Sequence, residues 1–366
     1  MITAYTLKGD NSPAEKIQLE KPTLTDGEVL LQTLVTEVCG TDLHIQSGAM
    51  KGIPYPVIPG HFMVGRVTEV AGHKKDINGT PIEPGQTLVF MDVHGTCGTC
   101  WNCTTASLPT KCGSRDVYGV THPVSAGPLG GWSEHVLLKA DVHCAVLPDS
   151  VTPERYIAAG CGLPTALHAV ERAQIQLFDT VLVQGAGPVG MSIAMLARAS
   201  GAKKVIIIDR NDARLDKARE LGFNHLVLSA GNLEADQQAL RDIAGPTGVD
   251  VVLEATGSPK AVSEGLSLVR EGGRYVIVGQ YSDNGDVEIN PHFQINRKHI
   301  SIHAVWGIEL SHFRKMIDIL GTEGETWDPV IMDQLDMKFY SLDEINQALL
   351  DVKEGRLTKA AIRVSE

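Results

Sequence analysis

The sequence predicts an α/β protein with a doubly wound parallel sheet, preceded by a β-rich segment. Strand-like apolar runs alternate with helical patterns between residues 181 and 278. A glycine-rich turn, 185–190, follows the first run, and the second run ends at Asp209. Strands that alternate with amphipathic helices are typical of a parallel sheet covered by helices on both faces.

The β-rich segment comes first in the chain. Short apolar runs between residues 2 and 38 are separated by turn-forming residues, among them Pro22 and the pair Asp26-Gly27. This pattern indicates short antiparallel strands. Because the chain has 366 residues, we expect two domains, each large enough to bury a core of its own.

Composition limits the partners and the compartment. The formal net charge is −12 and no run of Lys and Arg occurs, so we expect no nucleic-acid partner. The first residues include Lys8 and Asp10 without an apolar core, and no stretch approaches the ~20 apolar residues of a membrane helix. We therefore expect no membrane partner and a cytoplasmic location, where the seven cysteines are not expected to form disulfides.

The turn after the first predicted strand indicates a dinucleotide site. Gly185 allows a sharp turn, Gly187 lets the backbone approach a pyrophosphate, and Gly190 lets the following helix pack on the strand. Pro188 and Val189 open that helix, whose N-terminus would face the phosphates. The glycine pattern is a strong signal here because a strand precedes it and an acid follows at the end of the next strand.

The second strand predicts the identity of the cofactor. Asp209 is placed to accept hydrogen bonds from the adenosine ribose, and its charge would repel a 2′-phosphate, so we expect NAD rather than NADP. Arg210 could instead contact a phosphate, or it could lie across the adenine ring. Loops at the carboxyl ends of later strands, including Gly279, are also expected to line the cofactor, although ordinary loop chemistry would explain them as well.

Four cysteines between residues 97 and 112 predict a structural zinc site. They are Cys97, Cys100, Cys103 and Cys112, in a loop that also contains several glycines. Four thiolates at such spacing can close a tetrahedron around zinc with no open position, which is typical of a structural rather than a catalytic site.

Two further stretches carry reactive side chains. The stretch 38–44 places a thiol, a hydroxyl, a carboxylate and an imidazole within six positions, and His61 follows the turn Pro59-Gly60. Taken singly, the first is more often a solvated loop and the second a histidine of the core.

Together, however, these stretches resemble the zinc-dependent medium-chain alcohol and polyol dehydrogenase family, of the medium-chain dehydrogenase/reductase superfamily, and the resemblance extends over essentially the whole chain. It implies that Cys39 and His61 bind a catalytic zinc. It also implies roles for other side chains: Thr41 holds the substrate hydroxyl, His44 passes the proton to solvent, Asp42 orients the ligand imidazole, and Thr165 touches the nicotinamide.

The sequence departs from this family after His61. The family normally has glutamate at the next position, which is a zinc ligand in the polyol branch, whereas this chain has Phe62, which cannot bind metal. Cys161 stands where the alcohol dehydrogenase branch places its second cysteine ligand. Cys39, His61 and Cys161 would leave the open fourth position that a catalytic zinc needs. The alternative is that Cys161 is only a small buried residue at the start of the second domain.

The resemblance implies an NAD-dependent oxidoreductase with about two zinc ions per chain, which transfers hydride between a primary or secondary alcohol and NAD to give an aldehyde or ketone. A polyol, sugar or amino-alcohol (threonine-type) dehydrogenase is the nearest alternative, and a non-catalytic dinucleotide-binding protein is less favoured. The expected domains are a GroES-like catalytic domain (1–162, with the zinc lobe near 95–113), a Rossmann domain (163–303) and a segment that returns to the catalytic domain (304–366). A homodimer or homotetramer is also implied.

Overall fold

The computed structural model describes residues 1–322, 337–357 and 359–365. Part of the predicted C-terminal segment, 323–336, lies outside these residues. Contacts divide the chain into two compact units, each described separately below. The first unit consists of Met1–Gly160 and Glu309–Glu366, and the second unit consists of Cys161–Ile308.

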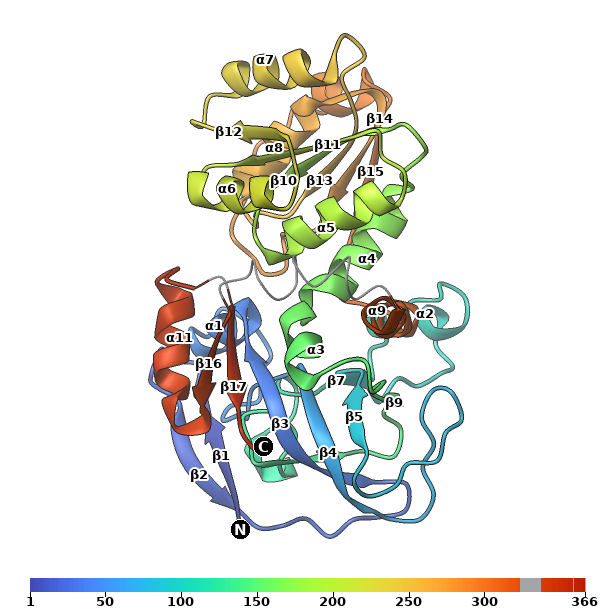
Figure 1. Cartoon of the computed structure of the whole chain (residues 1–366), viewed down its shortest axis with the longest axis vertical. Helices are drawn as coiled ribbons and strands as arrows, with labels where there is room; N and C mark the ends of the chain where they lie inside the picture. Colours follow the sequence, from blue (N-terminus) through green and yellow to red (C-terminus); the bar gives the residue numbers. More distant parts are fainter. Residues whose placement is uncertain (323–336, 358, 366) are drawn as a thin grey trace. The chain divides into compact units, whose positions relative to one another are not determined.

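The second unit is built on a six-stranded sheet in which every neighbouring pair is parallel (Figure 1). Its order is β12-β11-β10-β13-β14-β15. The strands are β10 (Thr180–Gln184), β11 (Lys204–Asp209), β12 (His225–Leu228), β13 (Val249–Glu254), β14 (Val269–Ile277) and β15 (Ser301–Ala304). The chain starts in the middle of the sheet and extends first to one edge and then to the other. The predicted doubly wound parallel sheet is therefore confirmed.

Helices cover this sheet. They are α4 (Gly162–Ala173), α5 (Pro188–Ala199), α6 (Asp212–Glu220), α7 (Leu233–Ala244) and α8 (Pro259–Leu268), with a single π turn at His292–Asn296. Helix α5 packs on β10 and β11, whereas α8 packs on β13 and β14. The central strands are largely apolar and buried because both faces of the sheet are covered there, as in β10, where every residue is buried.

The first unit is organised around the ten-residue strand β3 (Val29–Val38). Its seven-stranded sheet has the order β16-β17-β3-β4-β5-β9, with β8 paired to β3 outside this path. The other strands are β4 (Met63–Val70), β5 (Thr87–Phe90), β8 (His135–Leu138), β9 (Cys144–Val146), β16 (Met337–Ser341) and β17 (Lys359–Arg363). Strand β17, near the C-terminus, lies antiparallel beside β3, so both ends of the chain contribute to this sheet.

Smaller elements complete the first unit. Two strand pairs stand apart from the large sheet, β1 (Ile2–Thr6) with β2 (Glu15–Leu19), and β6 (Val93–His94) with β7 (Asp116–Val117). Among its described residues, the helices are α1 (Gly40–Gln46), α2 (Trp101–Thr104), α3 (Pro153–Ala159), α9 (Leu310–Thr322) and α11 (Ile345–Lys353). Helix α3 packs on β3, β4 and β17, which brings its end, Gly160, close to the central strands.

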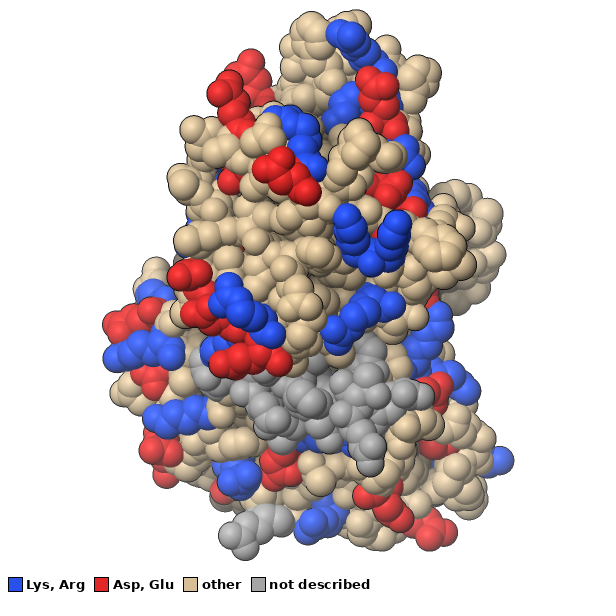
Figure 2. Space-filling view, turned by 45° about the horizontal axis from the view of Figure 1, so that its top comes forward, with Lys and Arg blue, Asp and Glu red and all other residues tan. Residues whose placement is uncertain are grey.

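On the face that Figure 2 shows, Lys and Arg side chains are interspersed with Asp and Glu side chains. Among the described residues, no helix is both long enough and apolar enough to cross a bilayer.

Candidate metal and cofactor sites

The loop between β3 and α1 holds Cys39 in a fixed position. Strand β3 ends at Val38, and Cys39 is the N-cap of α1. The buried carboxylate of Asp42 accepts a hydrogen bond from the backbone N–H of Cys39 at 2.8 Å and one from Gly60 N–H at 3.3 Å. Burial raises the pKa of Asp42, and the nearby His61 partly opposes this. Asp42 therefore fixes the backbone beside both predicted ligands, Cys39 and His61.

His61 is placed by a turn that only glycine can form without strain. Gly60 has φ +85°, and a Cβ there would lie 2.7 Å from the Trp132 ring. His61 itself is buried. The Nε2 atom of His61 lies 3.8 Å from Oε1 of Glu37.

The structure brings the predicted ligands together. The ligand atoms of Cys39, His61, Cys161 and one further residue, Glu37, all lie within 4.8 Å of one another. Zinc bonds of about 2.0–2.3 Å in a tetrahedron give distances of about 3.3–3.8 Å between ligand atoms, so the spacing and the donor types fit one zinc ion. Cys161 directly follows Gly160, the residue at which the first segment of the first unit ends.

Glu37 was not predicted from the sequence. It is fully buried in β3, and its Oε2 lies 2.9 Å from Nζ of Lys359 in β17. The available signal was a carboxylate within a strand of mostly apolar residues, two residues before Cys39. Buried carboxylates are rare unless they are paired or bind a metal.

Phe62 points into the core. Its ring stacks on Tyr156 with the ring centroids 5.0 Å apart. The Tyr156 side chain is fully buried, and burial raises the pKa of its hydroxyl, which the charges of Asp92 and Glu37 raise further. Phe62 therefore offers no ligand atom beside His61.

The two predicted proton-handling residues lie on one short helix. Thr41 is buried in the first turn of α1, and His44 is half-buried in its last turn. Residues three apart on a helix share a face. Burial lowers the pKa of His44, so its imidazole is neutral at neutral pH.

The four cysteines of the loop 97–112 form a second group. Their sulfur atoms all lie within 4.8 Å of one another; Cys100 and Cys103 are 3.5 Å apart, and Cys97 and Cys112 are 3.6 Å apart. Hydrogen bonds from Thr99 and from the backbone N–H of Cys100 lower the pKa of Cys97 to about 6. Four cysteine sulfur atoms this close together fit a closed structural zinc site.

A third group of possible ligands was not predicted. It consists of His94, Asp116 and His122. The Nε2 atoms of His94 and His122 are 2.9 Å apart, and Asp141 lies 3.2 Å from Nδ1 of His94. Hydrogen bonding along the row Asp141, His94 and His122 accounts for this arrangement without a metal.

In the second unit, the turn after β10 has the geometry that a dinucleotide needs. Gly185 has φ +101°, and a Cβ on Gly190 would lie 1.9 Å from the Gly185 carbonyl oxygen. A Cβ on Gly187 would meet no atom within 4 Å, which leaves open space at the start of α5. Helix α5 begins with Pro188 and Val189, and the first N–H groups of a helix have no partner within it.

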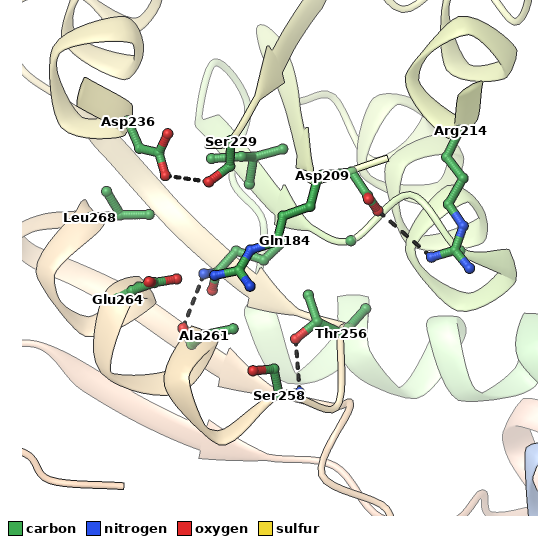
Figure 3. Close-up of a pocket in the computed structure, with 15 residues that line it drawn as sticks. Gln184, Asp209, Arg214, Ser229, Asp236, Thr256, Ser258, Ala261, Glu264 and Leu268 are labelled. Carbon is green, nitrogen blue, oxygen red and sulfur yellow. Dashed lines mark hydrogen bonds and ion pairs between the residues drawn. The ribbon is translucent and has the colours of Figure 1, made fainter. Parts of the chain in front are cut away.

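A cavity of about 200 Å³ lies beside this turn (Figure 3). Gly185, Gly187, Asp209 and Arg210 are among the residues that line it. Asp209 accepts hydrogen bonds from the backbone N–H of Ala186 at 2.6 Å and of Asn211 at 2.8 Å. These bonds fix the carboxylate at the end of β11, beside the turn.

Thr165 and Gly279, both predicted to line the cofactor, are each fixed by contacts with neighbouring residues. The hydroxyl of Thr165 donates to the carbonyl of Cys161 at 2.8 Å. Gly279 packs so closely that a Cβ would lie 2.4 Å from Gly257 N. Glu254 fixes the backbone of Gly257 and of Gly279. Its carboxylate accepts from Gly257 N–H at 2.9 Å and from Gly279 N–H at 3.2 Å.

Comparison with known proteins identifies the family. Residues 25–149 match the alcohol dehydrogenase GroES-like domain, and residues 188–322 match the zinc-binding dehydrogenase domain. The chain is 33% identical to 5-exo-hydroxycamphor dehydrogenase of Pseudomonas putida, over 92% of this chain and 91% of that protein. The chain belongs to the zinc-dependent medium-chain dehydrogenase family. It is therefore an oxidoreductase, and the predicted GroES-like domain is confirmed.

Other members of this family are similar over nearly their full length. L-threonine 3-dehydrogenase of Pyrococcus horikoshii is 30% identical, over 94% of each chain. Among solved structures, an alcohol dehydrogenase of Thermotoga maritima superposes with a TM-score of 0.92 at 30% identity, covering 100% of this chain and 99% of that one. The predicted oxidoreduction of alcohols, with a threonine-type enzyme as the alternative, agrees with these relatives.

Proposed function

We propose that this family member transfers hydride between a primary or secondary alcohol and NAD, giving an aldehyde or ketone. The convergence of Cys39, His61 and Cys161 is the observation that carries the proposal, because their ligand atoms lie within 4.8 Å of one another. Two thiolates and an imidazole form a donor set typical of a catalytic zinc site with an open position.

In this proposal Cys39, His61 and Cys161 hold the catalytic zinc, and the four cysteines of the loop 97–112 hold a structural zinc. When bound, the catalytic zinc supplies a Lewis acid that lowers the pKa of the substrate hydroxyl. The buried carboxylate of Asp42 keeps the backbone of the two ligand loops in place through Cys39 N–H and Gly60 N–H.

The chain's own residues handle the proton. The hydroxyl of Thr41 accepts the substrate proton and donates its own toward His44. His44 can take it up because burial lowers the pKa of its imidazole and leaves the ring neutral. Its position in the last turn of α1, half-exposed to solvent, allows release to water.

The second unit would hold the dinucleotide. Gly185, Gly187, Pro188, Val189 and Gly190 form the turn for the pyrophosphate, at the positive end of the α5 dipole. Asp209 would accept the ribose hydroxyls and disfavour the 2′-phosphate of NADP, with Arg210 lying beside the adenine. Thr165 and Gly279 are proposed at the nicotinamide end.

A second candidate is an amino-alcohol dehydrogenase, because L-threonine 3-dehydrogenases are among the most similar relatives. The purified chain with NAD should be offered cyclic secondary alcohols, linear alcohols, polyols and L-threonine, while the reduced nicotinamide is recorded. Turnover of the plain alcohols supports the first candidate, and turnover of L-threonine alone supports the second. No reduction with any of these compounds would contradict both.

We also propose a homodimer or homotetramer. The last strand of the parallel sheet, β15, lies at its edge and exposes Ile302 by 40%. An exposed apolar edge strand favours pairing with another chain. Light scattering on the purified protein would give the mass directly, and a monomer at micromolar concentration would contradict this proposal.

A further inference from the structure

A buried ion pair lies beside the proposed catalytic metal site. Glu37 and Lys359 are both buried, with Oε2 of Glu37 2.9 Å from Nζ of Lys359. Lys359 also donates to the carbonyl of Ala158 at 3.1 Å. Removing two charges from water costs several kcal/mol per ion, so a buried pair is a poor device for stability alone. We therefore expect the pair to have a function in the metal site.

The other carboxylate oxygen of Glu37 faces a predicted ligand. Oε1 of Glu37 lies 3.8 Å from Nε2 of His61, and the carboxylate lies within 4.8 Å of the sulfur atoms of Cys39 and Cys161. Phe62, the residue beside His61, turns its ring into the core and offers no ligand atom. Glu37 is directly across from it, because the Glu37 N–H donates to the Phe62 carbonyl at 3.2 Å.

The backbone leaves room for this pair. Gly160 has φ +50°, and a Cβ there would lie 1.9 Å from Nζ of Lys359 and 2.3 Å from Oε2 of Glu37. Any other residue at this position would displace one of the two side chains. The next residue, Cys161, carries the third predicted ligand, so the space for the ion pair and the position of that ligand depend on the same peptide.

We propose that Glu37 supplies the carboxylate of the catalytic metal site, where it can ligate the ion at the fourth position while no substrate occupies it. Lys359 holds this carboxylate by its other oxygen. The proposal rests on the metal set Cys39, His61 and Cys161 of the proposed function. Charge supports it: a divalent ion, two thiolates, one carboxylate and one ammonium sum to zero, so the buried group as a whole needs no further counter-ion.

The test uses cobalt in place of zinc and Glu37→Gln, which keeps the shape of the side chain and removes its charge. The difference in visible spectrum between the wild type and Cys39→Ala isolates this site from the four-cysteine site. We expect Glu37→Gln to shift that difference spectrum and to lose the cobalt to a chelator about 10-fold to 100-fold faster. The matched control is Glu28→Gln, another buried glutamate paired with a lysine, Lys139, at 3.1 Å, which should leave both readouts unchanged.

A second variant guards against misfolding, because Glu37→Gln leaves the Lys359 ammonium buried without its partner. Glu37→Gln/Lys359→Met removes both charges, and it should show the same spectral shift and the same rapid loss of metal. A wild-type spectrum and a wild-type chelation rate in the double variant would overturn the inference while leaving the proposed function intact. If Cys39→Ala itself lost no cobalt, the metal set would be wrong and the proposed function would fail with it.

Discussion

The ring of Phe62 lies on the ring of Tyr156, with 5.0 Å between the centroids and 7° between the planes. Both residues are almost completely buried in the first unit. Phe62 therefore contributes to packing beneath the candidate metal site, although it directly follows a predicted ligand in the sequence.

Replacing Phe62 by leucine should lower stability without removing metal. We expect a loss of about 1–2 kcal/mol in the free energy of unfolding, since the ring contact is lost while most of the volume is kept. Thermal unfolding and metal analysis measure the two effects. Phe293→Leu is the control, because Phe293 is 58% exposed and should change stability by less than about 0.5 kcal/mol. Loss of metal from Phe62→Leu would contradict a purely packing role.

Replacing Cys161 by alanine should release one metal ion. The purified chain should hold about two zinc ions, and Cys161→Ala should hold about one and show no turnover, because the remaining thiolate, imidazole and carboxylate hold zinc less tightly than a set with two thiolates. Cys144→Ala is the matched control, since Cys144 is buried in β9 and belongs to none of the three groups of possible ligands among the described residues. Two zinc ions retained in Cys161→Ala would mean that Cys161 only packs.

Replacing Asp209 by asparagine should weaken the preference for NAD. The change removes the charge that repels a 2′-phosphate. It also replaces one of the two oxygens that accept from Ala186 N–H and Asn211 N–H by an amide NH2. We expect NAD to bind about 10-fold more weakly and NADP to bind more tightly than in the wild type. Asp212→Asn, on the exposed first turn of α6, should bind both cofactors as the wild type does. Equal binding of both cofactors by the wild-type chain would mean that Arg210 outweighs the acid.

Glu28 should make the stability of the first unit depend on pH. Burial alone would raise the pKa of Glu28, but hydrogen bonds from Thr25 and Lys139 outweigh it and lower the pKa below the ordinary 4.5. A lowered pKa in the folded state means stability that is present above pH 4.5 and lost as the pH falls through the folded value. Glu28→Gln should therefore cost about 1–2 kcal/mol at pH 7 and almost nothing near pH 3. Denaturant titrations at the two pH values measure this, and an equal cost at both would contradict it.

The parts of the site that depend on short stretches of sequence could be predicted. Gly185, Gly187 and Gly190 act within one turn, so their spacing alone predicts the close contact between the Gly190 position and the Gly185 carbonyl. The four cysteines from Cys97 to Cys112 likewise lie within one loop. In both cases local geometry decides which atoms meet.

Glu37 could not be predicted in this way. Its partner Lys359 lies near the other end of the chain and reaches it only because β17 pairs with β3. Asp42 shows the same limit, because nothing in the sequence alone predicts that its carboxylate accepts from the backbone N–H groups of both Cys39 and Gly60. A single sequence contains the residue types, but the pairing of distant strands decides which of them meet.

The missing Cβ of Gly160 has a consequence for how this sequence can vary. A side chain at position 160 would collide with the pair Glu37 and Lys359, and an acid at position 62 would enter a packed aromatic contact beside the Glu37 carboxylate. Each change made alone is therefore expected to be harmful, and an acid at position 62 is expected to be tolerated only together with the loss of the Glu37 carboxylate. This dependence is sign epistasis. Moving the carboxylate from position 37 to position 62, by evolution or by design, requires several substitutions together, because each single intermediate has either two acids in this buried space or none.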